Sequence, residues 1–248
     1  MMKIFLIILS ILLSNNQQVD EIFKQSNDYY TNGDYEAAVD GYLEIINSGF
    51  ESAELYFNIG NSFYKLNNIP ESNFYFEKAL ALSPNDTDII TNLSFAQNLR
   101  IDKIENLPIT QIQNIKISAL DLFSEKGWAY SFVILVWLFC ISFILYVLLK
   151  NSRLKRTFFT LSIFIALISL SSLYLNYEKK ELSNIKFAII FDKEVEVWSE
   201  PNKISELKFL LHEGTKVKQV DLIEDWVNIQ LDNGTLGWIE VSSLRFLN

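Results

Sequence analysis

The sequence has one cysteine and one histidine among its 248 residues. A single cysteine, Cys140, excludes an intrachain disulfide and a metal site built from cysteines. The sequence also lacks HExxH and GxSxG motifs, a glycine-rich phosphate loop and a spaced cluster of metal ligands. Together these gaps predict a protein that is not an enzyme and has no catalytic residue, cofactor or bound metal. Paired acids such as Glu224 and Asp225 are interpreted as solvated charge.

Positive charge is also scarce, because 21 Lys and Arg residues stand against 30 Asp and Glu residues. The excess of acids lies in residues 19–127 and 176–248. Their acidity argues against nucleic acid as a partner, since binding to it requires clustered cations. It also disfavours electrostatic attachment to anionic lipid head groups.

Two uncharged segments of 21 residues each, Ala129–Leu149 and Thr157–Tyr177, dominate the middle of the chain. As helices they would each be roughly 31 Å long, enough to cross the ~30 Å hydrocarbon core of a bilayer. Residues 150–156 between them contain four cations and no acid, which is typical of a short cytoplasmic loop. The sequence therefore predicts a transmembrane hairpin with both flanking segments on the opposite side of the membrane.

Residues 1–18 are predicted to be a signal peptide or an N-terminal hydrophobic segment. Lys3 precedes the apolar run Ile4–Leu13, which is too short to span a bilayer. No clear small-x-small cleavage pattern follows this run. Cleaved or retained, the segment exports the residues that follow it.

Residues 19–100 contain an internal repeat with a period of 34 residues. The pattern resembles the tetratricopeptide repeat (TPR), which implies an all-α solenoid of antiparallel helix pairs. Residues 87–100 extend the period as a closing helix. So short an array is expected to be marginally stable unless a partner or a second copy packs on it. The positions that carry the resemblance are Tyr29, Gly33, Ala38 and Tyr42 in the first repeat and Tyr56, Gly60, Phe63, Ser72, Phe76, Ala79 and Pro84 in the second.

Three pairs of residues that lie 34 positions apart suggest a binding face on the repeats. The resemblance implies that these positions line the concave face of a TPR array. Amide groups can pair with the backbone of an extended peptide, and aromatic rings can contact its side chains. The alternative is that the aromatic residues only pack between helices, and the sequence leaves both interpretations open. The pairs are Phe23 with Phe57, Asn27 with Asn61, and Tyr30 with Tyr64.

Residues 101–128 are predicted to connect the repeats to the first transmembrane segment. Glu105–Pro108 interrupts the helical pattern, and Trp128 stands at the membrane boundary, where indole rings are favoured. Between them the sequence predicts either a helix on the membrane surface or an arm that packs on the repeats. The apolar residues on one face of that helix are Ile112, Ile115, Ala119, Leu122 and Phe123.

Residues 184–248 are predicted to form short strands, with a period-two inward set at Val217, Val227, Ile229 and Leu231. This segment resembles the bacterial SH3-like small barrel, and some such barrels bind cell-wall peptides. Trp226 and Trp238 are a possible binding surface, with barrel core or rim as the alternative. The residues that carry the resemblance are Glu200-Pro201, Leu211–Gly214, Asp225-Trp226, Gly234 and Gly237-Trp238.

The order of these segments resembles the BatE-type proteins of the aerotolerance operon. The resemblance implies a multidomain protein of the bacterial cytoplasmic (inner) membrane, with a TPR solenoid, a transmembrane hairpin and an SH3-like barrel. It implies membrane-bound von Willebrand A-domain proteins as partners, a MoxR-type ATPase as an indirect partner, and a link to oxidative stress. The sequence thus predicts a membrane-anchored periplasmic scaffold for protein–protein interaction. The alternative is a module that binds peptidoglycan peptides and recruits an envelope enzyme.

Overall fold

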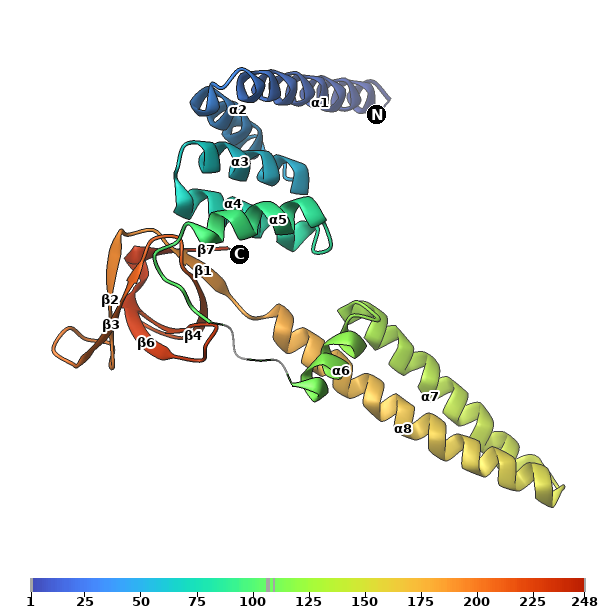
Figure 1. The fold of residues 1–248 in the computed structure, drawn as a ribbon. Coiled ribbons are helices and arrows are strands. Elements are labelled where there is room, and N and C mark those ends of the chain that lie inside the picture. The colour runs from blue at the N-terminus through green and yellow to red at the C-terminus, as the bar shows by residue number, and fades with distance from the viewer. Residues whose placement is uncertain (1, 106–107, 109, 248) are drawn as a thin grey trace. The chain divides into compact units, whose positions relative to one another are not determined.

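The computed structural model describes residues 2–105, 108 and 110–247, with the backbone alone for residues 2–16. It consists of two compact units. The first combines the N-terminal helices with the C-terminal strands, and the second contains the three helices between them (Figure 1). The side chains of the predicted signal segment lie almost entirely outside the described residues, and its described backbone continues into the first helix.

Five helices form the N-terminal part of the first unit. Side-chain caps define where the last four begin, because the side-chain oxygens of Asp34, Ser52, Asn68 and Asp86 each accept a hydrogen bond from a first-turn backbone N–H. Gly33 has a positive φ at the end of the first helix, where other residues would be strained. The helices are α1 (Met2–Thr31), α2 (Tyr35–Asn47), α3 (Ala53–Lys65), α4 (Ile69–Leu82) and α5 (Thr87–Asn98).

Small residues lie where α3 and α4 come closest, as the repeat pattern predicts. The Ser72 hydroxyl donates a hydrogen bond to the Gly60 carbonyl at 2.9 Å. A Cβ atom on Gly60 would lie 2.7 Å from the ring of Phe76, which is fully buried. Ala38, the equivalent of Ser72 in the first repeat, is also fully buried. The predicted helix-to-helix contact is therefore confirmed.

The C-terminal part of the first unit is a seven-stranded antiparallel sheet in the order β3-β2-β6-β5-β4-β1-β7. The four residues of the predicted inward set are all buried, so the alternation identified the core side of these strands. Gly234 takes a positive φ in the turn between β5 and β6, as the Asp-Asn-Gly sequence indicates. The strands are β1 (Phe187–Ile190), β2 (Glu194–Trp198), β3 (Leu207–His212), β4 (Lys216–Ile223), β5 (Trp226–Gln230), β6 (Leu236–Glu240) and β7 (Leu244–Phe246).

The sheet packs on α4. The Arg245 guanidinium lies 3.9 Å from the ring centroid of Phe74 and 4.1 Å from that of Phe191, and it pairs with Glu71. Asn73, buried on α4, donates a hydrogen bond to the Gly214 carbonyl at 2.9 Å. The extra contact that so short a repeat array was expected to need is thus supplied by the C-terminal part of the same chain.

The second unit contains α6 (Gln111–Leu120), α7 (Glu125–Leu148) and α8 (Ser152–Ser183), with α7 and α8 packed as an antiparallel hairpin (Figure 1). The two uncharged segments lie in α7 and α8, which are long and apolar enough to cross a membrane. The loop predicted over residues 150–156 is shorter than expected. Asn151 caps α8, and Ser152 is already helical, because Lys and Arg are good helix formers.

The distribution of side chains in the α7–α8 hairpin is the reverse of that in a soluble helical pair. The buried residues include Ser142, Ser162 and Ser172, and the Ser142 hydroxyl donates to the Phe158 carbonyl at 3.1 Å. Large apolar side chains point outward, with Trp137 67% exposed and Phe164 64% exposed. Small residues are enriched between helices that pack in lipid.

Candidate functional site

The predicted binding residues lie on the first helices of the two repeats. Phe23, Asn27 and Tyr30 are on α1, Phe57, Asn61 and Tyr64 are on α3, and all six are partly exposed. The sheet packs on α4, the second helix of its repeat.

Phe23 and Phe57 pack against the second helix of their own repeats. The Phe23 ring centroid lies 5.8 Å from that of Tyr42, and Phe57 lies 5.8 Å from Phe76. Both phenylalanines are in contact with buried core residues. The structure therefore gives these two rings a packing role, and their contact with a partner stays a prediction.

Asn27 is already engaged within the repeats. Its Oδ1 accepts hydrogen bonds from the Tyr42 hydroxyl at 2.5 Å and from Asn58 Nδ2 at 3.2 Å, which joins α1, α2 and α3. Burial, assisted by the nearby Tyr30, raises the pKa of Tyr42 to about 12, so its hydroxyl stays a donor. These residues and Thr31 line a hollow of about 250 Å³. The prediction that the Asn27 amide pairs with a partner backbone did not foresee these intramolecular bonds.

Asn61 lacks both donors that Asn27 has: Asn92, the equivalent of Asn58, donates to the Asp88 carbonyl instead, and the equivalent of Tyr42 has no hydroxyl. The residue 34 positions after Tyr42 is Phe76, which has no hydroxyl to donate to Asn61. Among the described residues, the Asn61 side chain makes no hydrogen bond. Tyr64 packs beside the cluster of Phe76, Leu93 and Ala96. The second repeat therefore presents a free amide and a tyrosine on the same helix.

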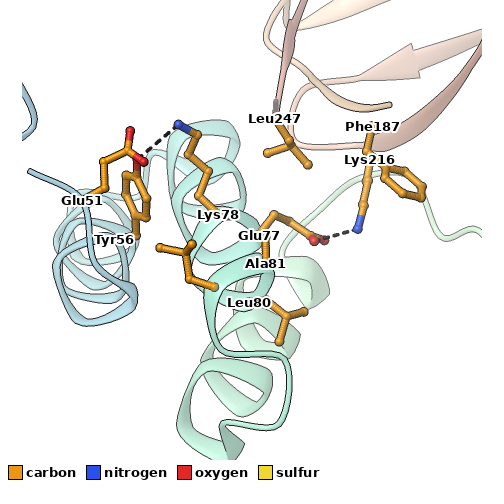
Figure 2. A pocket seen from close by; sticks show the side chains of 10 residues that line it. Glu51, Tyr56, Glu77, Lys78, Leu80, Ala81, Phe187, Lys216 and Leu247 are labelled. Carbon is orange, nitrogen blue, oxygen red and sulfur yellow. Dashed lines mark hydrogen bonds and ion pairs between the residues drawn. The ribbon is translucent and has the colours of Figure 1, made fainter. Parts of the chain in front are cut away.

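A hollow of about 500 Å³ lies where α3 and α4 meet the sheet (Figure 2). It contains one ion pair and one hydrogen bond, since Lys216 Nζ lies 2.6 Å from Glu77 Oε2 and Lys78 Nζ donates to the Tyr56 hydroxyl at 3.3 Å. Burial, followed by a hydrogen bond to Glu51, raises the pKa of Tyr56. The rest of the lining is largely apolar: Leu80, Ala81, Leu82, Phe187 and Leu247. This hollow can take an apolar side chain of a protein partner.

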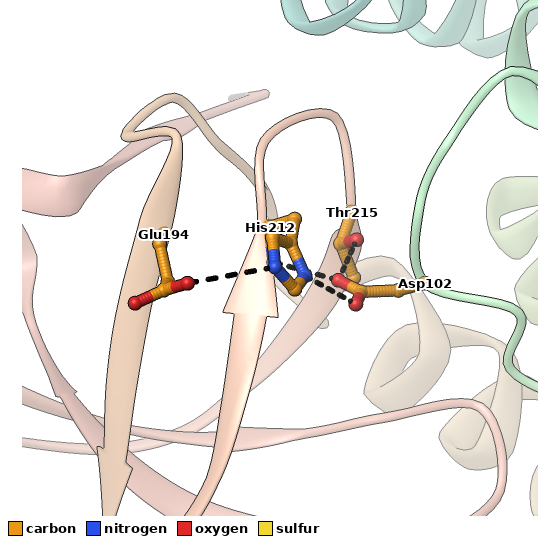
Figure 3. A network of polar contacts seen from close by, with 4 residues as sticks. All are labelled: Asp102, Glu194, His212 and Thr215. Carbon is orange, nitrogen blue, oxygen red and sulfur yellow. Dashed lines mark hydrogen bonds and ion pairs between the residues drawn. The ribbon is translucent and has the colours of Figure 1, made fainter.

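A polar network holds the segment after α5 against the sheet (Figure 3). The Asp102 carboxylate accepts hydrogen bonds from the His212 backbone N–H at 2.7 Å, from the Thr215 hydroxyl at 2.7 Å, and pairs with His212 Nδ1 at 2.8 Å. In a catalytic triad the histidine stands between acid and nucleophile. Here the acid stands in the centre, and the buried Thr215 hydroxyl donates to it. The arrangement is therefore not a catalytic triad. It links the segment after α5 to the sheet.

The network predicts a loss of stability in acid. Burial alone would raise the pKa of Asp102, but the hydrogen bonds from His212 and Thr215 outweigh it and lower the pKa below its usual 3.8. A carboxyl group with a lowered pKa stabilises the fold above its unfolded-state pKa, and this contribution is lost as the pH falls through the folded-state pKa. We expect the free energy of unfolding to fall as the pH drops below about 4.

Chemical denaturation of the full chain at about pH 5 and about pH 3 measures this loss. Asp102→Asn removes the titrating group and keeps the side-chain volume, so the variant should depend less on pH than the native chain. Equal pH dependence of both proteins would show that Asp102 does not contribute.

Trp226 and Trp198 line a pocket of about 290 Å³ on the sheet, together with Glu194, Glu196 and Glu240. Trp238, which the sequence pairs with Trp226, is opposite Trp198 on the neighbouring strand and does not line this pocket. The sequence pattern did not single out Trp198, although this residue ends β2, in which exposed and buried residues alternate. Over the part of the chain that the structure describes, no group of three His, Cys, Asp or Glu residues could hold a metal ion.

Comparisons with known proteins identify the repeat. Residues 53–86, which include α3 and α4, match the family described as "Tetratricopeptide repeat". The chain therefore contains a TPR. No curated protein matches the chain. Among solved structures, YrrB, described as a TPR protein with an unusual peptide-binding site, is 14% identical over 68% of this chain and 87% of its own, with a TM-score of 0.30. A TM-score of 0.30 does not show that the two proteins share a fold.

Proposed function

We propose that this chain is a membrane-anchored, non-enzymatic scaffold whose repeats bind an extended segment of a protein partner. The match to the tetratricopeptide repeat at residues 53–86 carries the proposal, because helical repeats present continuous surfaces for protein partners. Asn61 and Tyr64 on α3 form the proposed contact surface. The free amide of Asn61 would pair with the partner backbone, and the ring of Tyr64 would contact a side chain.

The proposed anchor is the α7–α8 hairpin in a bacterial cytoplasmic membrane. Two findings support it: the length and apolar composition of both helices, and the serine residues buried between them while large apolar side chains face outward. The cations at Lys150–Arg156 favour a cytoplasmic location for the hairpin tip. The repeats and the sheet would then be periplasmic.

The proposed partners are other membrane proteins, including von Willebrand A-domain proteins, in a complex linked to aerotolerance. The order of segments along the chain supports this part of the proposal, as does the resemblance of the C-terminal strands to a bacterial SH3-like domain. The hollow in Figure 2 adds an apolar contact beside the repeats.

A second candidate function is binding of peptidoglycan peptides by the sheet. The pocket between Trp198 and Trp226 favours it, because Glu194 and Glu196 can pair with the amino groups of such peptides and the indole rings can stack on these groups. The third glutamate, Glu240, is already paired with Lys203 at 2.9 Å. Retention of the chain on isolated cell walls, lost on Trp226→Ala, is the expected result if this function holds.

Replacing Asn61 with alanine tests whether the proposed contact surface binds a protein partner. Partners captured by crosslinking in native membranes would first be identified, and their affinity for the purified chain then measured. Asn61→Ala removes a neutral hydrogen bond worth about 0.5–1.5 kcal/mol, so binding should weaken by roughly two- to tenfold. Asn47→Ala, an exposed asparagine on the second helix of the first repeat, is the matched control.

Asn27→Ala is a poorer test, because it also breaks the bonds to Tyr42 and Asn58. A folded Asn61→Ala chain that binds as tightly as the native one would place the contact elsewhere on the molecule.

A further inference from the structure

Helix α6 carries apolar side chains that none of the described residues of its own unit covers. Ile112 is 80% exposed and Ile115 is 70% exposed, and Leu122 and Phe123 just after the helix are also exposed. The helix is well formed, because the Thr110 hydroxyl and the Gln113 side chain make a reciprocal capping box at its start. A helix that leaves isoleucines in water forgoes the free energy that burial of their side chains would contribute.

Contacts within the second unit fix where α6 lies. Lys116 forms an ion pair of 2.5 Å with Glu178. Asp121, the residue after the helix, forms another of 3.1 Å with Lys179. The Leu120 carbonyl accepts a hydrogen bond from the Trp128 indole at 3.4 Å. The helix is therefore held beside the end of α8 and the beginning of α7.

These contacts place α6 at the level where the uncharged segments end. Glu178 and Lys179 directly follow Tyr177, the last residue of the second uncharged segment, and Trp128 directly precedes Ala129, the first residue of the other. If the hairpin crosses a bilayer, this level is the boundary between the hydrocarbon core and the head groups, where indole rings are favoured.

The helix period separates the exposed residues of α6 into two flanks. Lys116 and Leu120 mark the side that packs on the hairpin. At about 100° per residue, Ile112 and Ile115 lie on one flank of that side, whereas Asn114 and the less exposed Ile117 lie on the other. The Ile112–Ile115 flank is therefore the more strongly exposed apolar flank, and an exposed apolar flank is what a helix lying along an interface needs.

We propose that α6 is an interfacial helix whose Ile112–Ile115 flank binds the surface of the phospholipid bilayer. The proposal rests on the proposed function, since it requires the hairpin to span the membrane. Two observations favour lipid over a protein partner: α6 is held where the uncharged segments end, and it is joined to α7 by a short turn. Lys116 and Asp121, the charged residues of α6 and its C-cap, are paired with Glu178 and Lys179, so binding of α6 depends on apolar contact and not on lipid charge.

Fluorescence quenching in a bilayer tests this inference. The full chain carrying Cys140→Ser would be reconstituted in phosphatidylcholine vesicles with single cysteines bearing an environment-sensitive dye. The sites are Ile112→Cys, Ile115→Cys, Asn114→Cys as the matched control on α6, and Trp137→Cys as the reference on α7. The quencher is phosphatidylcholine with a nitroxide near the head group.

We expect quenching of at least about twofold at Ile112 and Ile115 and much less at Asn114, because an interfacial helix buries one flank about 5–10 Å deep. Trp137 should be shielded from a water-soluble quencher. If Trp137 is shielded but Ile112 and Ile115 behave like Asn114, the inference is overturned and the hairpin stands. If Trp137 is not shielded, the membrane anchor fails and the inference fails with it.

Discussion

Gly60→Leu is expected to unfold the second repeat at physiological temperature. A Cβ atom at this position would lie 2.7 Å from the Phe76 ring, and the contact has no room for the three further carbons of leucine. Phe76 is fully buried and cannot move aside without disturbing its neighbours. Overpacking of this kind costs about 1–3 kcal/mol or more, a large share of the stability of a short array.

Hydrogen exchange of the α3 and α4 amides measures this effect separately from the long helices α7 and α8. Exchange of both helices should accelerate in Gly60→Leu, since their protection depends on the contact between them. Lys65→Leu is the matched control, because it places the same side chain at an exposed position of α3. Unchanged protection in Gly60→Leu would mean that α3 and α4 do not approach each other at Gly60.

Local patterns in the sequence predicted the elements of the fold well. The 34-residue period located the helix pairs because each close approach requires a small residue at a fixed place. The alternation at Val227 and Ile229 located β5 because only one side of the sheet faces the core. Such signals lie within a few residues of one another, so a single sequence contains them.

Contacts between distant segments could not be predicted. Asp102 and His212 are 110 residues apart, and neither residue has a neighbour that signals the other. The packing of Arg245 on Phe74 is equally non-local. For the same reason the sequence did not show that the strands and the repeats form one compact unit.

The predicted binding face illustrates how a correct period can mislead about chemistry. Asn27 and Asn61 occupy equivalent positions, but Tyr42 and Phe76, also equivalent, differ by one hydroxyl. That hydroxyl occupies Asn27 Oδ1 in the first repeat and leaves Asn61 without such a partner in the second. A period gives the position of a residue, whereas its hydrogen bonds depend on what the neighbouring helix presents.

The hairpin tip should be inaccessible from the periplasm. Single cysteines at Ser152 and Asn233 in a Cys140→Ser chain are both exposed, one at the start of α8 and the other in the turn between β5 and β6. Four cations next to the tip should hold it in the cytoplasm. The bilayer should then stand between an impermeant thiol reagent and residue 152, but not between the reagent and residue 233.

Anchoring of the repeats depends on this topology, because without a spanning hairpin the repeats are not held at the membrane. Labelling of intact cells whose outer membrane has been permeabilised is the most direct measurement, with lysed cells as the control for reactivity. We expect the cysteine at position 233 to react in intact cells and the cysteine at position 152 to react only after lysis. Equal labelling of both positions in intact cells would contradict the membrane hairpin.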